Sequence, residues 1–196
     1  MENTGMNGHQ RQREQSAGMI ETALFALLEE KEWKAISVSE IVTTADVARR
    51  TFYRLYRGKE EVLHQYFVRL CREYTGSCRT LKQYDFGQIA SDYFRFWHGH
   101  KEELLLLYQR GMKDRLFYEI GCAAREVVES RVEETGRKNH GAIACFSDYS
   151  SGGFLMLLYR WLEEGMEGTP EDYAAKVCAA LMKFIRPVSE EMPENK

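Results

Sequence analysis

The sequence predicts an all-α protein. Apolar residues recur at helical spacing along almost the whole chain of 196 residues. Only three prolines occur, at positions 170, 187 and 193, so no proline interrupts a helix before the first of these. A composition of 44% hydrophobic and 29% charged residues fits one compact body, or a small domain joined to a larger one. We therefore expect helices packed into one or two domains.

The chain is expected to begin with a disordered tail over residues 1–10, which are polar. A first helix is expected over residues 11–33, where apolar residues form one stripe. Short helices follow as far as about residue 72, and longer ones occupy residues 73–196. The boundary between the two expected domains is placed at that change.

The second helix has a complete start signal in the segment ISVSEI. Ser37 stands at the N-cap and Glu40 at the third helical position, the spacing of a reciprocal capping box. Ile36 and Ile41 occupy the two positions of a hydrophobic staple. The apolar pattern lasts only two turns before the sequence ADVA interrupts it, so the second helix is expected to be short.

A short third helix is expected up to about Tyr56, and a fourth begins at Lys59 after a break at Gly58. Residues 47–59 contain five basic side chains and no acidic one. Two short helices joined by a tight turn, the second of them basic, form the plan of the helix-turn-helix motif. Residues 11–72 are therefore expected to be a three-helix, DNA-binding domain of this type.

One face of the expected third helix is cationic. At about 100° per residue, the opposite face is apolar and can pack on the first two helices. Solvated faces usually mix charges of both signs, whereas like charges here repel one another unless an anion neutralises them. An ordinary amphipathic surface helix is the alternative, but arginine forks suit guanine edges and tyrosine hydroxyls suit phosphates. The cationic face carries Arg49, Arg50, Tyr53, Arg54 and, at its end, Arg57.

The start of the fourth helix is a second candidate contact with DNA. The free N–H groups of a helix N-terminus, with Lys59 beside them, can hold an anion.

Beyond residue 75 the helical segments lengthen. Three are expected, over residues 86–100, 101–134 and 141–168. A last helix opens with Thr169 as its cap and Pro170 at the first helical position.

The segment ISVSEIVTTADVARRTFYRLYRGKEEVLHQYF resembles the DNA-binding domain of TetR-family bacterial transcriptional regulators. Three positions depart from the family pattern. Asp46 stands where the turn usually has glycine, Ala48 replaces the serine that caps the recognition helix, and Leu55 replaces a common phosphate ligand. The missing cap costs about 1 kcal/mol. The resemblance implies base contacts from Arg49, Arg50 and Thr51, and phosphate contacts from Tyr53, Lys59 and Thr43 or Thr44; Arg54 joins them from the cationic face.

The resemblance also implies a homodimer, because one short recognition helix reads too few bases, and a two-fold dimer matches a palindromic operator. In the family the last two helices pair across the two-fold axis. The alternative is that these helices are simply the core of the second domain. The glycine pair 152–153 would allow close approach of helices. The candidate interface residues are Phe154, Leu158, Trp161, Val177 and Leu181.

The region 86–150 is rich in large amphipathic side chains, and in the family this region holds a small-molecule effector pocket. For any single aromatic residue there, core packing is the alternative. The candidate pocket residues are Tyr93, Trp97, Tyr108, Met112, Phe117, Phe146 and Tyr149.

Other classes of function find little support. The five cysteines are scattered without CxxC spacing, as is typical of reduced thiols in a cytosolic protein. His98 and His100 point about 200° apart on a helix, so no metal site is expected. No cofactor motif, catalytic motif, signal peptide or run of about 18 apolar residues is found. We expect a cytoplasmic protein that is neither an enzyme nor bound to a membrane.

Two hypotheses remain from the sequence. The first is a homodimeric transcriptional regulator, expected to be a repressor because a dimer on a promoter blocks polymerase, and controlled by a small-molecule effector. The alternative is an interaction protein of the same fold that acts through another protein and does not read DNA alone. Ala48 and Leu55 leave room for this second hypothesis.

Overall fold

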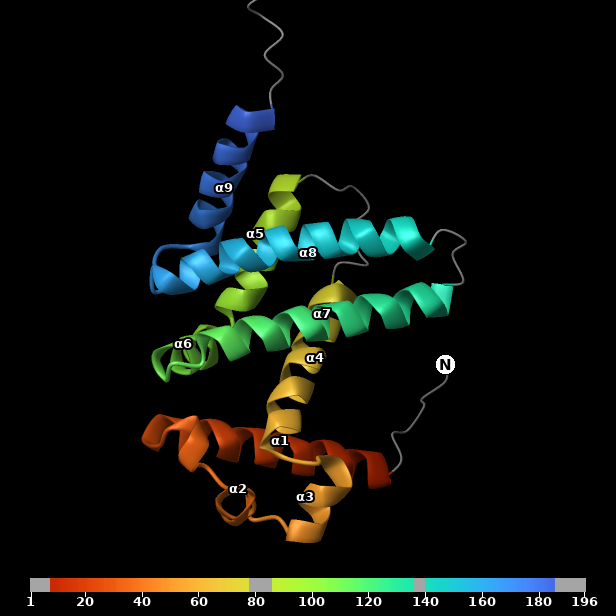
Figure 1. The fold of residues 1–196 in the computed structure, drawn as a ribbon, viewed down its shortest axis with the longest axis vertical. Helices are drawn as coiled ribbons and strands as arrows, with labels where there is room; N and C mark the ends of the chain where they lie inside the picture. The colour runs from red at the N-terminus through yellow and green to blue at the C-terminus, as the bar shows by residue number, and fades with distance from the viewer. Residues whose placement is uncertain (1–7, 78–85, 136–139, 186–196) are drawn as a thin grey trace, which may run out of the picture.

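The structure, a computed structural model, describes residues 8–77, 86–135 and 140–185, apart from some side chains near helix ends. The regular structure in these residues is entirely helical, which confirms the all-α prediction (Figure 1). The elements are α1 (Gly8–Glu30), the 3₁₀ helix η1 (Trp33–Ala35), α2 (Val38–Thr44), α3 (Arg49–Leu55), α4 (Lys59–Ser77), α5 (Phe86–His98), α6 (Lys101–Gln109), α7 (Lys113–Thr135), α8 (His140–Glu163) and α9 (Pro170–Ile185).

Helix α4 joins the two halves of the molecule. At one end α1, α2 and α3 form a small group, in which α2 and α3 lie on the far side of α1 from the rest (Figure 1). At the other end α7 and α8 pack side by side, and α5 packs on α8 and α9. Because α4 contacts both α1 and α7, the expected boundary at residue 72 falls inside a helix that both halves share.

The first helix differs from the prediction at both ends. It begins at Gly8 rather than Arg11, and Gln10 donates a hydrogen bond to Glu14 one turn later (3.3 Å), which supports helix in the expected tail. Residues 1–7 lie outside the described residues. The helix ends at Glu30, and Trp33 belongs to η1, where Lys59 and Arg115 lie over its ring.

The predicted capping box is confirmed. The Glu40 backbone N–H donates to Ser37 Oγ (3.2 Å), and the Ser37 backbone N–H donates to the Glu40 carboxylate (2.8 Å). The Lys31 ammonium also contacts this carboxylate, and together these bonds lower the pKa of Glu40 to about 2. At the other end of the chain, Thr169 caps α9 as expected, since Asp172 N–H donates to its hydroxyl (3.1 Å).

The turn between α2 and α3 is a Schellman motif with an aspartate in place of glycine. Asp46 has φ of 50°, a left-handed conformation that aspartate tolerates. Val47 N–H donates to Val42 C=O (3.1 Å) and Asp46 N–H to Thr43 C=O (3.2 Å), which is the pairing of that motif. The departure from glycine therefore leaves the turn intact.

The segment expected as one helix over residues 101–134 is two helices. Gly111 has φ of 71°, and Met112 N–H donates to Leu107 C=O (3.0 Å), so a second Schellman motif ends α6. The break turns the chain, and α7 then packs across α4 (Figure 1).

Candidate nucleic-acid interface and effector cavity

The cationic face lies on α3, at the end of the molecule farthest from α8 and α9 (Figure 1). Its underside is fixed by Phe52, which is fully buried, and by Tyr56, which caps the helix C-terminus and packs on Phe52 at 5.8 Å between ring centroids. Leu55 is half-buried against the same core. A helix of only seven residues is marginal alone, so this packing holds α3 in place.

Most of the predicted DNA-contacting residues are exposed. Thr43 and Thr44 from α2 and Arg49, Arg50 and Arg54 from α3 are exposed. Tyr53 is 50% exposed and Thr51 is half-buried. Among the described residues, the arginines of this face form no ion pair within 4 Å, so their charge is available to an anion. As expected, Ala48 provides no side-chain cap.

Arg49 is held between the two helices of the motif. Its guanidinium donates to Ser39 Oγ (3.1 Å) and to the Tyr53 hydroxyl (3.4 Å), and lies 5.6 Å from the Tyr53 ring centroid. Ser39 lies on the face of α2 that also carries Thr43, whose hydroxyl donates to the Ser39 carbonyl (2.9 Å). Sequence reasoning missed Ser39, although its position one turn before Thr43 was a usable signal.

Lys59 faces inward. Its ammonium donates to the carbonyls of Trp33 and Ile36, both at 2.6 Å, and lies 4.9 Å from the Trp33 ring centroid. These bonds attach the start of α4 to η1 and to the segment before α2. A phosphate would have to compete with two carbonyls, so the structure argues against the phosphate contact expected for this side chain.

The helix start at Gly58 is also occupied. The backbone N–H of Arg57 donates to the Glu61 carboxylate (2.7 Å), and Glu60 and Glu61 both stand in the first turn of α4. A fixed carboxylate already takes the place that an incoming anion would need. The anion site expected here is therefore not one that the described side chains favour.

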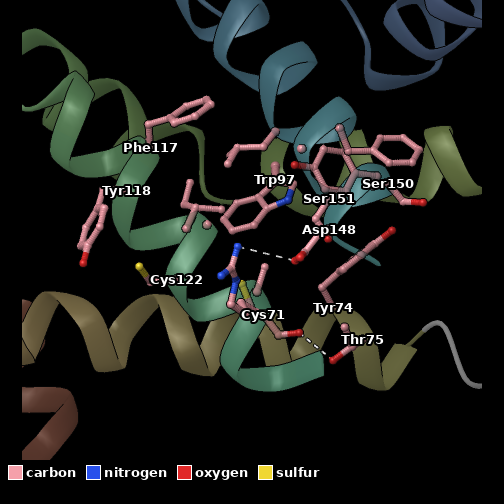
Figure 2. A pocket seen from close by; sticks show the side chains of 18 of the residues that line it. Cys71, Tyr74, Thr75, Trp97, Phe117, Tyr118, Cys122, Asp148, Ser150 and Ser151 are labelled. Carbon is pink, nitrogen blue, oxygen red and sulfur yellow. Dashed lines mark hydrogen bonds and ion pairs between the residues drawn. The ribbon is translucent and has the colours of Figure 1, made fainter. Parts of the chain in front are cut away.

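A cavity of about 680 Å³ lies between α4, α5, α7 and α8, within the size range of small-molecule sites (Figure 2). Its wall is mainly aromatic and aliphatic. The upper end of α4 contributes Cys71, Tyr74 and Thr75, and α7 contributes Tyr118 and Cys122. Sequence reasoning missed these five residues, because nothing in their spacing separates a cavity wall from core packing.

Three of the residues predicted to form the effector pocket line this cavity, namely Tyr93, Trp97 and Phe117. Three others lie outside it. Met112 is buried in the core, Tyr108 packs on Tyr159, and Tyr149 is 84% exposed. The side chain of Phe146 lies outside the described residues.

The predicted dimer-interface residues are mostly covered by their own chain. Leu158, Trp161 and Val177 are buried, and Trp161 donates to the Glu167 carbonyl (3.0 Å), so they are core residues. Phe154 packs on Tyr93 and lines the cavity. Of the five, only Leu181 is exposed, at 37%.

A different stripe of α8 and α9 faces outward. Tyr149 and Met156 on α8, the latter 56% exposed, lie about two turns apart, with the glycine pair 152–153 between them. A Cβ added to either glycine would meet nothing within 4 Å. On α9, Met182 is 58% exposed beside Leu181. The outward stripe, as we name these six residues, is apolar and open to a partner.

Comparison with known families settles the class of the protein. The family model described as "Bacterial regulatory proteins, tetR family" matches residues 20–66, and the one described as "Transcriptional regulator C-terminal region" matches residues 85–183, which is more than half of the chain. This chain belongs to the TetR family of transcriptional regulators.

Individual relatives of this TetR-family chain are distant. It is 29% identical over 101 residues to the HTH-type dhaKLM operon transcriptional activator DhaS of Lactococcus lactis subsp. lactis (strain IL1403), an alignment that covers 52% of this chain and 46% of that one. Lin0861 from Listeria innocua has the same fold, with a TM-score of 0.65 at 14% identity over 92% of this chain and 96% of that one. So does a dihydroxyacetone kinase operon activator DhaS, with a TM-score of 0.53 at 16% identity over 87% and 96%.

In this TetR-family chain a charged cluster links α4, which follows the helix-turn-helix motif, to α7, which lines the cavity. His64 on α4 places Nδ1 2.8 Å from Glu119 Oε2 and Nε2 3.3 Å from Glu126 Oε2, both on α7. Glu119 is 5% exposed and also accepts from Arg115 (3.2 Å). The cluster adds polar bonds to the apolar contact between α4 and α7.

The two histidines at the junction of α5 and α6 are used for packing. His98 stacks on Trp161 (5.5 Å) and His100 packs on Phe96 (5.2 Å), and burial lowers the pKa of His100. Within the described part of the chain, no group of three or more His, Cys, Asp or Glu side chains could hold a metal ion. No described helix of this TetR-family regulator is long and apolar enough to cross a membrane.

Proposed function

We propose that this regulator acts in the cytoplasm as a homodimer that binds a palindromic DNA operator and responds to a small molecule held in its cavity. The observation that carries the proposal is the exposed cationic face, on which Arg49, Arg50 and Arg54 have no acidic partner among the described residues. Hydroxyl groups from α2 border these arginines. That combination suits direct reading of guanine edges with phosphate contacts on either side.

DNA reading is tested by selecting bound sequences from random duplexes with the full chain. A palindromic consensus is expected, and no enrichment would favour the alternative of an interaction protein that does not read DNA alone. Gel shifts on the selected operator then compare Arg50→Ala with Lys113→Ala, which removes one charge from the exposed start of α7. Arg50→Ala should weaken operator binding by about five- to a hundredfold, the worth of one good base contact, whereas Lys113→Ala should change little.

The dimer is proposed to form through the outward stripe of α8 and α9. An exposed apolar stripe with a glycine pair lets two helices approach closely, and burying it removes apolar surface from water. Met156→Lys should shift sedimentation from dimer to monomer. Met19→Lys on α1, where Met19 is also exposed at 38%, is the matched control and should leave the dimer unchanged. A dimer that survives Met156→Lys would place the interface elsewhere.

The effector is proposed to act through α4. This helix starts four residues after α3 ends, and its far end lines the cavity with Cys71, Tyr74 and Thr75. A ligand and DNA that prefer different positions of α4 oppose each other's binding reciprocally. Repression is the proposed direction, because a dimer bound at a promoter excludes polymerase. A promoter–reporter fusion decides it, with activation, as in the name of the Lactococcus relative, as the opposite outcome.

A further inference from the structure

The cavity wall contains a buried hydrogen-bond donor without an acceptor. Trp97 is 2% exposed, and among the described residues its indole N–H has no hydrogen-bond partner. Figure 2 shows the indole lying between α7 and α8, in the wall of the cavity. Because indole N–H can only donate, an unpaired one in a buried place lowers the stability of the ligand-free state.

The neighbouring Tyr93 does not satisfy this donor. Burial raises the pKa of Tyr93 well above its ordinary value, and the nearby Trp97 N–H partly opposes that rise, so the two groups are close. Their geometry nevertheless falls outside that of a hydrogen bond. By contrast, the N–H of Trp161, which does not line the cavity, donates to the Glu167 carbonyl at 3.0 Å. Of these two tryptophans, Trp97 is therefore the one whose N–H can donate to a ligand.

The described residues of the wall carry no net charge. Their charged side chains are Arg125 and Asp148, which pair with each other at 3.7 Å (Figure 2). Both are more than half exposed, at 65% and 58%, so they lie at the mouth rather than deep in the cavity. A ligand with a net charge would bury that charge without an opposite partner, which is strongly unfavourable. The aromatic wall instead suits ring stacking and edge-to-face contacts.

We propose that the effector of this cavity is an uncharged molecule with an apolar, ring-containing body and one hydrogen-bond acceptor that the Trp97 N–H binds. This assignment rests on the proposed function only in taking the cavity as the effector site. The N–H is nearly covered by neighbouring side chains, so a small rotation of the indole or of Tyr93 must accompany binding. A carbonyl, ether or ring-nitrogen acceptor satisfies the donor without bringing a charge inside.

The proposal is tested by calorimetric titration of the full chain with three probes that share a naphthalene ring system. They are 2-acetylnaphthalene, 2-ethylnaphthalene and 2-naphthoate. The ketone has the acceptor, the hydrocarbon lacks it, and the carboxylate adds a charge. Trp97→Phe removes the N–H and keeps a ring, so it should reduce the affinity for the ketone about five- to tenfold more than the affinity for the hydrocarbon. The carboxylate should bind more weakly than the ketone.

Two further variants keep the test decisive. The N–H of Trp161 already donates to a carbonyl of the protein. Trp161→Phe should therefore change the binding of the two neutral probes equally. Tyr93→Phe removes the neighbouring hydroxyl as a competing acceptor and should preserve the preference for the ketone. The proposal is overturned if Trp97→Phe weakens the binding of both neutral probes equally. It is also overturned if the carboxylate binds more tightly than the ketone, or if no probe binds. DNA selection on the ligand-free protein is independent of all these results, so the proposed function stands or falls separately.

Discussion

The inward placement of Lys59 leads to a prediction opposite to the one that its sequence position suggests. In Lys59→Ala the chain loses two hydrogen bonds from a charged donor to the carbonyls of Trp33 and Ile36. A hydrogen bond involving a charged group contributes about 1.5–3 kcal/mol when buried. Because Lys59 is partly exposed, water replaces part of each bond, and we expect a total loss of about 1–3 kcal/mol in the free energy of unfolding.

Two measurements check this prediction. Urea unfolding followed by circular dichroism, at one protein concentration because a dimer unfolds in a concentration-dependent manner, should show the loss of stability. Operator affinity measured over a salt series should keep its slope. A lysine that contacts a phosphate would instead contribute about 0.9 to the slope of log affinity against log salt.

The matched control is Lys34→Ala, since Lys34 is an exposed lysine of η1. It removes the same charge close to the same segment, and we expect little change in stability. The reasoning is refuted if Lys59→Ala unfolds like the wild-type protein while its salt slope falls by about one unit.

Two further predictions concern the helix-turn-helix motif. The Lys31 ammonium and Ser37 hold the pKa of Glu40 at about 2, below the ordinary 4.5. The stability contributed by this carboxylate is therefore present above pH 4.5 and is lost as the pH falls toward 2. Thermal melts across this range should show a smaller acid-induced loss of stability in Glu40→Gln than in the wild-type protein. Asp46 has a φ of 50°, so Asp46→Ala should destabilise the chain by about 1 kcal/mol while Asp46→Gly is neutral or stabilising, and equal effects of the two in urea unfolding would contradict the role of the left-handed turn.

The parts of the fold that were predictable from sequence are those fixed by neighbouring residues. Ser37 and Glu40 form a capping box, and Thr169 caps α9, because caps depend on groups three residues apart. The break at Gly111 is equally local, but the apolar pattern continues on both sides of it and therefore predicts one continuous helix. Short-range chemistry of this kind can be read from one stretch of chain.

The parts that were not predictable depend on which distant segment covers a side chain. Lys59 beside Gly58 has the same sequence pattern whether its ammonium faces solvent or two carbonyls that lie 23 and 26 residues away. Leu158 and Met156 are both apolar residues of α8, yet one is buried and the other is 56% exposed. Only the tertiary arrangement distinguishes a core residue, a cavity wall and an outer surface on such a helix.

The position of α4 has a consequence for how the molecule unfolds. Phe25 of α1 packs on Tyr66 of α4 at 4.9 Å between ring centroids, while α7 contacts the same helix through the His64 cluster. Neither half can therefore lose its structure without exposing a face of α4, and we expect a single cooperative transition. A molecule bound in the cavity then stabilises the whole unit by mass action. Hydrogen exchange should accordingly slow at amides of α1 and α3, far from any atom that the ligand touches.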